Sequence, residues 1–219
     1  MSDAYTPSSQ FSAFPPVIKG LIVANVLVAL AMLVPPTAEL LYSWFALWAY
    51  GVRPGVQPGA FLPWQLVSYG FLHGGFGHLF FNMLALWMFG VPVEQAWGSK
   101  RFAWYYFLCL VGAGITQLVV ITLQGSPYPT VGASGAVLGV LLAFGMMYPD
   151  VPIYLYFFVP IKAKYLVVLY ALLDLFGGFS GSATGVAHFA HLGGMLTGFI
   201  VLQAWRRTYA RRRERLYRG

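Results

Sequence analysis

Six apolar segments divide this chain, and a helix needs about 20 mostly apolar residues to cross the hydrocarbon of a bilayer. Only 9% of the 219 residues are charged and 59% are apolar, whereas an ordinary soluble domain is about 25% charged. The apolar segments run over residues 17–34, 78–97, 102–123, 134–148, 165–176 and 186–205. The sequence therefore predicts an all-α membrane protein, built as a bundle of six transmembrane helices.

The connections between these segments differ in character. The first, 35–77, is long, and its stretch 40–48 is rich in Trp and Tyr, which favour the membrane–water interface. We therefore expect this first loop to contain interfacial helices. Three prolines within 149–160 predict an irregular connection between the fourth and fifth segments, and Gly177-Gly178 and Gly181 predict the end of the fifth.

Basic residues indicate the orientation of the bundle. Twelve of the 13 Lys and Arg residues fall on one side of the predicted spans, and Arg53 alone falls on the other. Cytoplasmic connections carry the excess of Lys and Arg, so both termini are predicted to be cytoplasmic. We expect a multi-pass protein of the cell membrane, and its minimal form suits a bacterial inner membrane.

The chain ends in a basic tail, Arg206 to Arg218, which holds seven arginines opposed only by Glu214. Directly after an apolar helix, such a tail is expected to contact anionic lipid rather than nucleic acid. The predicted organisation is a cytoplasmic N-terminal segment (1–16), a membrane domain (17–205) and a cytoplasmic tail (206–219).

Four polar side chains stand near the outer ends of the second, fourth and sixth spans. His78 and Asn82 open the second span on one helix face. Ser134 opens the fourth span, and His191 lies early in the sixth. Burying an unpaired polar group costs about 1–3 kcal/mol, so we expect these residues to share one site at a similar depth.

The chemistry of these residues suits acyl transfer. Ser134 is a candidate nucleophile, and His191 is a candidate base that removes its proton. The backbone N–H of Ser134 and the side chains of His78 and Asn82 could stabilise an oxyanion. Simpler explanations exist: Ser134 as a helix N-cap, and His78 and Asn82 as interhelical hydrogen-bonding residues.

Small residues favour close packing of the fourth and sixth spans. Gly135 and Gly139 are four apart, as are Gly194 and Gly198, and this spacing permits close approach of membrane helices. Such packing would bring the Ser134 hydroxyl within reach of the His191 imidazole.

A metal centre is a less favoured alternative. His188 and His191 are three apart, and His73 and His78 are five apart, but no Asp or Glu accompanies either pair. We therefore expect no metal and no cofactor. The single cysteine, Cys109, lies in an apolar run and is expected to be a small core residue.

The chain resembles the rhomboid family of intramembrane serine proteases. The resemblance is carried by Gly132-Ala133-Ser134-Gly135, by His78-Leu79-Phe80-Phe81-Asn82 and by Ala190-His191 followed by Gly194 and Gly198. It implies Ser134 as nucleophile and His191 as base of a two-residue dyad. It also implies an oxyanion hole of His78, Asn82 and the Ser134 amide, and transmembrane protein substrates cut near the outer face through an acyl-enzyme.

Two positions depart from the family pattern. Trp64-Gln65 stands where the family often has Trp-Arg, and Leu138 stands where some members carry a Tyr that stacks on the catalytic His. The pattern gives Asp174 and His188 no catalytic role. We expect a structural or neutral role for Asp174, and a place for His188 at the mouth of the site.

Two other functional classes are weighed. A non-proteolytic rhomboid-like protein that binds membrane proteins would share the fold, but the presence of both Ser134 and His191 favours the protease. A small-solute transporter would show broken helices or inverted repeats near the midplane, whereas the polar residues here gather at one face. The glycine-rich stretch 177–182 is expected to act as a mobile cap over the site.

Overall fold

The computed structural model describes residues 13–51, 61–126, 128–155, 158–180 and 187–217, and over these residues the chain is mostly helical. The helices, in chain order, are α1 (Pro16–Ala31), α2 (Pro35–Phe45), α3 (Gln65–Ser68), the 3-10 turn η1 (Tyr69–Phe71), α4 (Phe76–Trp97), α5 (Ser99–Leu123), α6 (Ser134–Met147), α7 (Ala163–Phe179) and α8 (His188–Tyr217). Strands β1 (Pro152–Leu155) and β2 (Val159–Lys162) pair as an antiparallel hairpin.

Each of the six predicted apolar segments falls on a helix, which confirms the mostly helical framework. These helices are α1, α4, α5, α6, α7 and α8. Among the described residues, α4 and α5 are long and apolar enough to cross a membrane, whereas α1 and α6 are apolar but shorter. The count of six membrane crossings stays a prediction.

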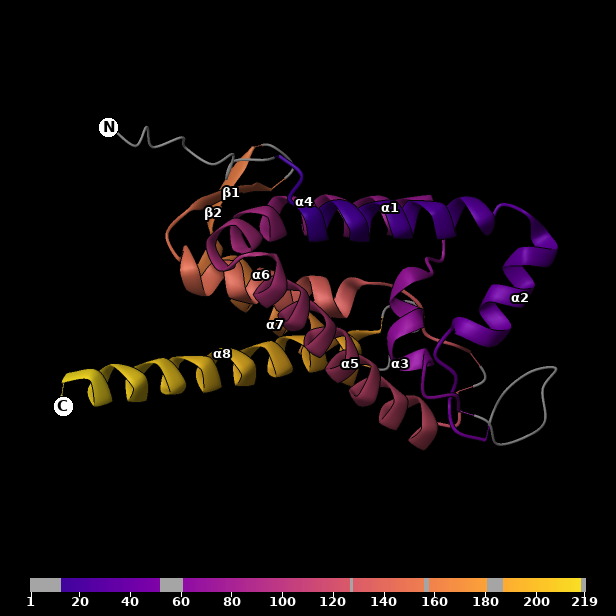
Figure 1. The fold of residues 1–219 in the computed structure, drawn as a ribbon. Helices are drawn as coiled ribbons and strands as arrows, with labels where there is room; N and C mark the ends of the chain where they lie inside the picture. Colours follow the sequence, from indigo (N-terminus) through magenta and orange to yellow (C-terminus); the bar gives the residue numbers. More distant parts are fainter. Residues whose placement is uncertain (1–12, 52–60, 127, 156–157, 181–186, 218–219) are drawn as a thin grey trace, which may run out of the picture.

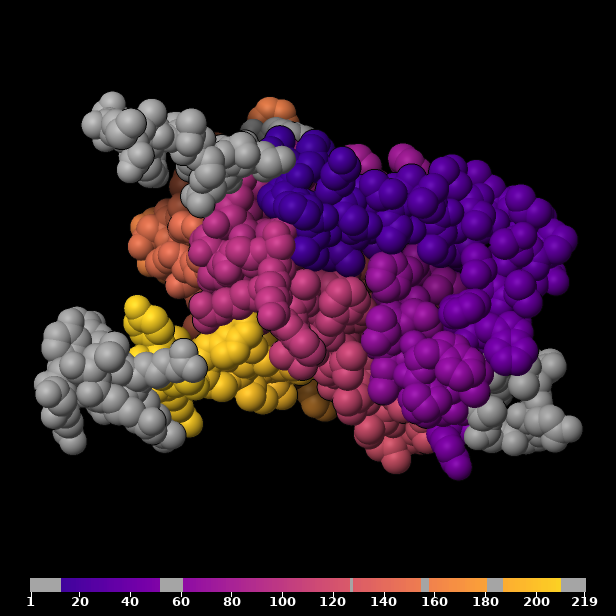
Figure 2. Space-filling view, viewed as in Figure 1, coloured from indigo at the N-terminus to yellow at the C-terminus, as the bar shows by residue number. Residues whose placement is uncertain are grey.

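Helix α6 forms the centre of the bundle, and most of its residues are buried. It packs against α4, α5, α7 and α8, and α8 also lies along α5. Figure 1 shows α8 running beside the bundle and extending beyond it. In the space-filling view, α1 and α2 cover the upper flank of the visible face (Figure 2).

The two ends of the bundle differ in chemistry. The basic end holds the start of α1, the α4–α5 turn and the hairpin, and the far end of α8 lies toward it (Figure 1). There Asp150 accepts hydrogen bonds from Lys164 Nζ at 2.8 Å and Lys162 Nζ at 3.1 Å. The opposite end, which we call the site end, holds the starts of α4, α6 and α8 and the end of α7.

The first connection contains a helix, but its predicted limits, 40–48, are wrong. Helix α2 begins at Pro35 and ends at Phe45, because proline is well suited to the first helical position, where its missing N–H has no intrahelical acceptor. After α2 the chain is extended, and Leu47 exchanges backbone hydrogen bonds with Thr130 at 3.0 and 2.8 Å.

The prediction of an irregular connection between the fourth and fifth segments is also wrong, because β1 and β2 form a hairpin there. Pro152 lies opposite Lys162, and Pro160 lies opposite Tyr154. Proline is tolerated in this hairpin because both strands are edge strands, so an N–H that faces away from the partner is not needed.

Gly177-Gly178 do not end the fifth segment, since α7 continues to Phe179, and Gly181, the other glycine of that prediction, lies outside the described residues. A Cβ at Gly177 would lie 2.5 Å from Cε1 of His188, and one at Gly178 would lie 3.0 Å from the Phe189 ring. These glycines therefore allow α7 to pack closely against α8. Much of the predicted cap is helical for this reason, and its residues 181–182 lie outside the described part of the chain.

The basic tail does not separate from the sixth span, because α8 continues through Tyr217. The described side chains of this stretch include Arg206 and Arg207, which are exposed. Arg53, residue 186 at the predicted start of the sixth span and most of the N-terminal segment 1–16 lie outside the described residues.

Candidate active site

Ser134 is the first residue of α6, and the turn before it sets its position. Gly132 has a φ of +123°, a conformation that residues with a side chain rarely adopt. A Cβ at Gly132 would also lie 2.7 Å from Cε1 and Nε2 of His78. The N-cap of α6 is Ala133, and no side chain caps this helix. The N-cap explanation for Ser134 is therefore wrong.

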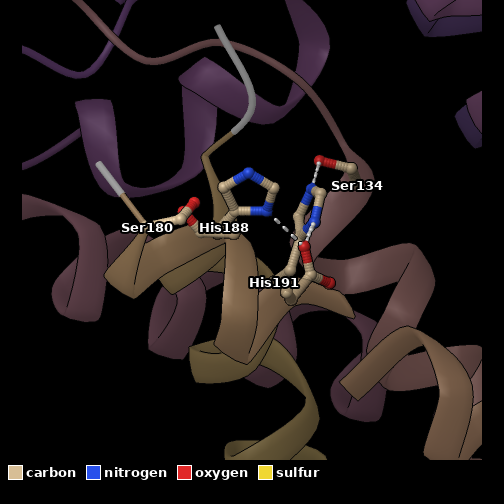
Figure 3. Close-up of polar contacts among 6 residues, drawn as sticks. Ser134, Ser180, His188 and His191 are labelled. Atoms are coloured by element: carbon tan, nitrogen blue, oxygen red, sulfur yellow. Dashed lines mark hydrogen bonds and ion pairs between the residues drawn. The ribbon is translucent and has the colours of Figure 1, made fainter. Parts of the chain in front are cut away.

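The hydroxyl of Ser134 instead meets His191, because Oγ lies 2.7 Å from Nε2 of the imidazole (Figure 3). His191 is in the first turn of α8, and its side chain is 13% exposed. Residues 57 positions apart in sequence are thus in hydrogen-bonding contact. This is the arrangement in which a histidine can remove a serine proton.

Glycines permit the close approach of α6 and α8 that this contact requires. A Cβ at Gly194 would collide with the carbonyl oxygen of Gly135, and one at Gly139 would lie 3.2 Å from the carbonyl oxygen of Gly194. Gly198 faces α5 instead, where a Cβ would collide with the Tyr105 hydroxyl. Three of the four predicted packing glycines therefore lie at the α6–α8 crossing.

His78 and Asn82 lie one turn apart on α4 and line the same cavity as Ser134 and His191. The Gly74 N–H donates to Nδ1 of His78 at 3.4 Å, so a neutral His78 carries its proton on Nε2 and can donate from there. Asn82 is 6% exposed, and its Nδ2 donates to the His78 carbonyl oxygen at 2.9 Å. An amide nitrogen carries a second hydrogen, which suits a donor to a ligand.

Asp174 of α7 also reaches this site, which the sequence reasoning missed. Its Oδ1 lies 2.9 Å from Nδ1 of His191 and 2.8 Å from Nδ1 of His188. Dashed contacts lead from the His188 and His191 imidazoles in Figure 3, and both of these hydrogen bonds have the same oxygen, Oδ1, as their partner. A carboxylate in an apolar membrane segment is rare and usually functional, and that was the available signal in the sequence. His188 lines the cavity, where it was expected.

Two cavities meet at Ser134 and His191. The first has a volume of about 430 Å³ and is mostly apolar, with Phe81, Leu141 and Leu173 among its lining residues. The second, of about 830 Å³, is lined by polar residues that include Gln117, Gln124, Ser126 and Thr130. His78, Ser134 and His191 line both. The nucleophile therefore stands between an apolar space and a polar one.

The turn before α4 adds a second histidine beside His78. The rings of His73 and His78 meet edge to face with centroids 4.9 Å apart. Burial, and to a smaller extent the nearby His78, lower the pKa of His73 to about 4. His73 is therefore neutral at neutral pH and adds no positive charge to this side of the site.

Gln65, at the position where the family often has Arg, supports the first loop rather than the cavity. It is completely buried, and its Nε2 donates to the Trp44 carbonyl oxygen at 3.2 Å. Its Oε1 accepts the Trp48 N–H at 3.5 Å. A neutral amide thus joins α3 to the end of α2 and to the segment that follows it.

Among the described residues, no group of three or more His, Cys, Asp and Glu side chains is arranged to hold a metal ion. Cys109 is a buried free thiol on α5, in the contact with Gly139 of α6. Its place is that of a small core residue, as expected from its apolar surroundings.

Comparison with known proteins gives consistent similarities. A family model described as the Rhomboid domain matches residues 61–207. Rhomboid protease GluP of Bacillus subtilis is 36% identical over 141 residues, which are 64% of this chain and 26% of GluP. RHOMBOID-like protein 4 of Arabidopsis thaliana is 33% identical over 138 residues, 63% of this chain and 33% of that protein.

A yeast protein shows the same extent of similarity. Rhomboid protein 1, mitochondrial, of Saccharomyces cerevisiae is 30% identical over 146 residues, 64% of this chain and 41% of that protein. The matched part of this chain thus spans less than half the length of each of these three relatives.

Proposed function

The chain belongs to the rhomboid family, and on this basis we propose that it is an intramembrane serine endopeptidase. Its substrates are transmembrane proteins, cleaved near the outer face of a cell membrane. The observation that carries the proposal is the 2.7 Å contact between Ser134 Oγ and His191 Nε2 at a cavity. The name of GluP as a rhomboid protease supports the same activity.

Cleavage proceeds through an acyl-enzyme. His191 Nε2 takes the proton of Ser134 Oγ as the oxygen attacks the scissile carbonyl carbon, and a tetrahedral oxyanion forms. His191 then gives that proton to the leaving amine as the C–N bond breaks. Water attacks the remaining ester with His191 again as base, and the released products are a carboxylic acid and the regenerated Ser134 hydroxyl.

The oxyanion is stabilised by donors that are already in place. Asn82 Nδ2 and His78 Nε2 supply side-chain N–H groups, and Ser134 supplies its backbone N–H at the start of α6. The first N–H groups of a helix have no intrahelical acceptor, and the helix dipole there favours negative charge. All three donors come from the site end of α4 and α6.

The two cavities divide substrate from water. The apolar cavity lies between α4 and α7, with Phe81 on one side and Leu173 on the other, and this lining suits an apolar substrate segment. The polar cavity suits the hydrolytic water, because its Gln, Ser and Thr groups can hydrogen-bond water. The stretch 177–182 is proposed to control access to the first cavity.

Location follows from the same arrangement. The basic end, with Lys100, Arg101, Lys162 and Lys164, is placed in the cytoplasm, and the site end faces outward. Both termini are then cytoplasmic, and the protein is multi-pass. A bacterial inner membrane is the proposed location.

The test compares wild type with Ser134→Ala and His191→Ala in detergent, using a model transmembrane substrate. We expect both variants to cleave at less than about 10⁻³ of the wild-type rate, because nucleophile and base act as one unit. Ser43→Ala, which removes a hydroxyl of α2 that donates to the Glu39 carbonyl oxygen, is the matched control and should cleave normally.

A fluorophosphonate probe separates this proposal from the alternative. It should label wild type and Ser43→Ala but neither of the other variants. Equal cleavage by wild type and Ser134→Ala would disprove the proposal. Absence of cleavage and labelling in wild type, together with binding of a membrane protein, would indicate a non-proteolytic rhomboid-like protein instead.

A further inference from the structure

Asp174 is the buried acid that the dyad mechanism leaves without a role. It is 5% exposed, and its Oδ1 contacts Nδ1 of both His188 and His191. Its Oδ2 is buried and has no hydrogen-bond partner among the described residues. The acid therefore directs one oxygen to the candidate base and leaves the other unsatisfied.

The contact determines which nitrogen of His191 carries the proton. To accept the Ser134 proton, Nε2 must present a lone pair, so a neutral His191 must carry its hydrogen on Nδ1. A carboxylate oxygen can only accept, so Asp174 Oδ1 at 2.9 Å requires that hydrogen on Nδ1. The same oxygen then favours the imidazolium that forms when Ser134 attacks.

We propose that Asp174 is a positioning residue that holds His191 in the Nδ1–H form facing Ser134, so that the site works as a serine–histidine–aspartate triad. This inference rests on the proposed protease function. It gives Asp174 a role that the family pattern does not, and it supplies support for His191 where Leu138 replaces a stacking tyrosine.

A purely structural role explains the arrangement poorly. A buried carboxylate is costly to desolvate, and a pair that leaves one oxygen unsatisfied is often less stable than an apolar replacement. Asp174 faces an apolar cavity, which offers no protein donor to Oδ2 among the described residues. Instead, the imidazoles of His188 and His191 both bond to Oδ1, the oxygen that contacts the candidate base.

His188 acts with Asp174. It lies one turn before His191 on α8, and Gly177 provides the space for its ring. Two N–H donors on one oxygen restrict rotation of the carboxylate more than one donor does. The titratable groups that line the cavity with Asp174 are His78, Tyr170, His188 and His191, so His188 is the neighbour whose removal tests this restriction.

The activity test uses Asp174→Asn, with Asp150→Asn as a matched control at the exposed basic end. Asp174→Asn should lower kcat by at least about 10²-fold, and by up to the roughly 10⁴-fold known for amidation of a triad aspartate. KM should stay unchanged, and Asp174→Glu should recover part of the rate. His188→Gln should lower kcat by less than about tenfold, the value of one hydrogen bond.

Proton NMR of protein with ¹⁵N-labelled histidine provides a readout that needs no protease activity. A strongly downfield Nδ1–H resonance of His191 is expected in wild type and Ser134→Ala, and it should be lost in Asp174→Asn. Wild-type turnover in Asp174→Asn, or a wild-type spectrum with His191 protonated on Nε2, would overturn the inference. If wild type does not cleave, the protease proposal fails while the spectrum still tests the hydrogen bond.

A different observation concerns the basic end. A groove of about 770 Å³ lies between the α4–α5 turn and α8. The Arg101 guanidinium lies over the Trp205 ring at 4.2 Å from its centroid, and at 5.5 Å from that of Trp97. Aromatic rings from α4 and α8 thus hold the Arg101 charge in place.

One face of α5 changes from charged to apolar along this groove. Lys100, Trp104 and Leu108 follow at four-residue spacing and so lie on one helix face. Trp104 is 62% exposed and Leu108 is 40% exposed. None of the described residues that line the groove is acidic. This order matches that of an anionic phospholipid. Lys100 corresponds to the headgroup, Trp104 to the glycerol region and Leu108 to the acyl chain.

We infer that this groove binds an anionic phospholipid, with its phosphate at Lys100 and Arg101 and an acyl chain along Trp104 and Leu108. Basic pockets between helices on the cytoplasmic side bind such headgroups. The sequence predicted lipid contact for the tail 206–218, and this groove adds a site in the membrane domain itself.

Tryptophan fluorescence in nanodiscs tests the site. Phosphatidylglycerol with brominated chains should quench wild type more than brominated phosphatidylcholine does. Lys100→Ala with Arg101→Ala should weaken this preference by about 30-fold, from two cations near an anionic surface. The control variant, Lys162→Ala with Lys164→Ala, removes the same charge from the same end of the bundle. It should keep the wild-type preference for phosphatidylglycerol. The inference would be overturned if both double variants lost this lipid preference equally, or if Lys100→Ala with Arg101→Ala kept it. Displacement of the lipid by inorganic phosphate would also overturn it.

Discussion

Two buried carboxylates, Glu94 at the basic end and Asp174 at the site end, show how the same chemical group serves different purposes. Glu94 is 2% exposed and accepts three hydrogen bonds, from Val17 N, Ile18 N and Ser99 Oγ, at 3.0, 2.9 and 2.6 Å. Asp174 is 5% exposed and meets only imidazole nitrogens among the described residues, both at one oxygen.

Glu94 and Asp174 differ in the chemistry of their hydrogen-bond partners. Glu94 satisfies the first N–H groups of α1 and so joins the start of α1 to the α4–α5 turn. Its partners other than Ser99 are backbone groups, which do not change protonation. The partners of Asp174 are two imidazole rings, which can take up and give away protons during a reaction. We therefore expect Glu94 to affect stability, and Asp174 to affect turnover.

Two buried asparagines extend the comparison, and of the changes compared below Asn82→Ala has the largest expected effect. Asn82 Nδ2 donates to His78 O at 2.9 Å, and Asn25 Nδ2 donates to Leu21 O at 2.8 Å, so the local hydrogen bond is the same. Only Asn82 lines the cavity with Ser134. Asn82→Ala should lower kcat by about 10–10³-fold, as loss of an oxyanion donor does.

The control for this prediction is Asn25→Ala, measured with the same substrate and corrected for the folded fraction. Its kcat should match wild type even if its melting temperature falls. A similar loss of kcat in both variants would mean that Asn82 acts through helix stability, and the contrast between the two positions would disappear.

A smaller effect is expected from Glu94→Gln. A glutamine can accept only at its one oxygen, so a buried N–H of Val17 or Ile18 loses its acceptor, which costs about 1–3 kcal/mol of unfolding free energy. Turnover per folded molecule should remain that of wild type. Chemical unfolding in detergent and a substrate assay on the same sample measure both quantities.

Glu39→Gln, at an exposed residue of α2, provides the matched change of charge and should leave unfolding nearly unchanged. The comparison breaks if Glu94→Gln lowers kcat as strongly as Asp174→Asn does. In that case the basic end would control the site through α4 rather than only hold the helices together.

The smallest effect is expected at Asp150. Hydrogen bonds from Lys164 and then Lys162 lower the pKa of Asp150. A lowered carboxyl pKa contributes stability above the usual value of about 4, and that contribution disappears as pH falls through the lowered pKa. Because these ion pairs are exposed, the contribution is small and is reduced further by salt.

Melting curves of wild type and Asp150→Asn should therefore nearly coincide at neutral pH and converge fully in acid. A large difference in melting temperature at neutral pH that disappears only in acid would contradict this prediction. It would mean that the exposed Asp150 contributes as much to stability as the buried carboxylates do.

Much of the framework followed from local pattern. Apolar runs of near-spanning length predicted the helices that became α1 and α4 to α8, because a helix in hydrocarbon must satisfy its own backbone. Boundaries were misplaced at Pro35, at Gly177-Gly178 and at the end of the sixth span, where α8 continues to Tyr217. Proline can begin a helix as well as end one, and glycine can serve helix packing as well as a turn, so local residue type did not decide between them.

The candidate site, like the helical framework, could be predicted in part from the sequence. Ser134, His191, His78 and Asn82 could be assigned from motif and depth, and they line one cavity in the structure. Asp174 was not assignable, because nothing in its local sequence indicates which side of α7 faces α8.

The sequence by itself determined the helical segments, the basic end and the group of polar residues near one face, since these depend on composition and spacing along the chain. Only the tertiary structure placed Asp174 against His191. That contact depends on how α7 rotates and how closely it approaches α8, which Gly177 and Gly178 permit by leaving room for His188 and Phe189. Packing between distant segments decides such contacts, and no local pattern records it.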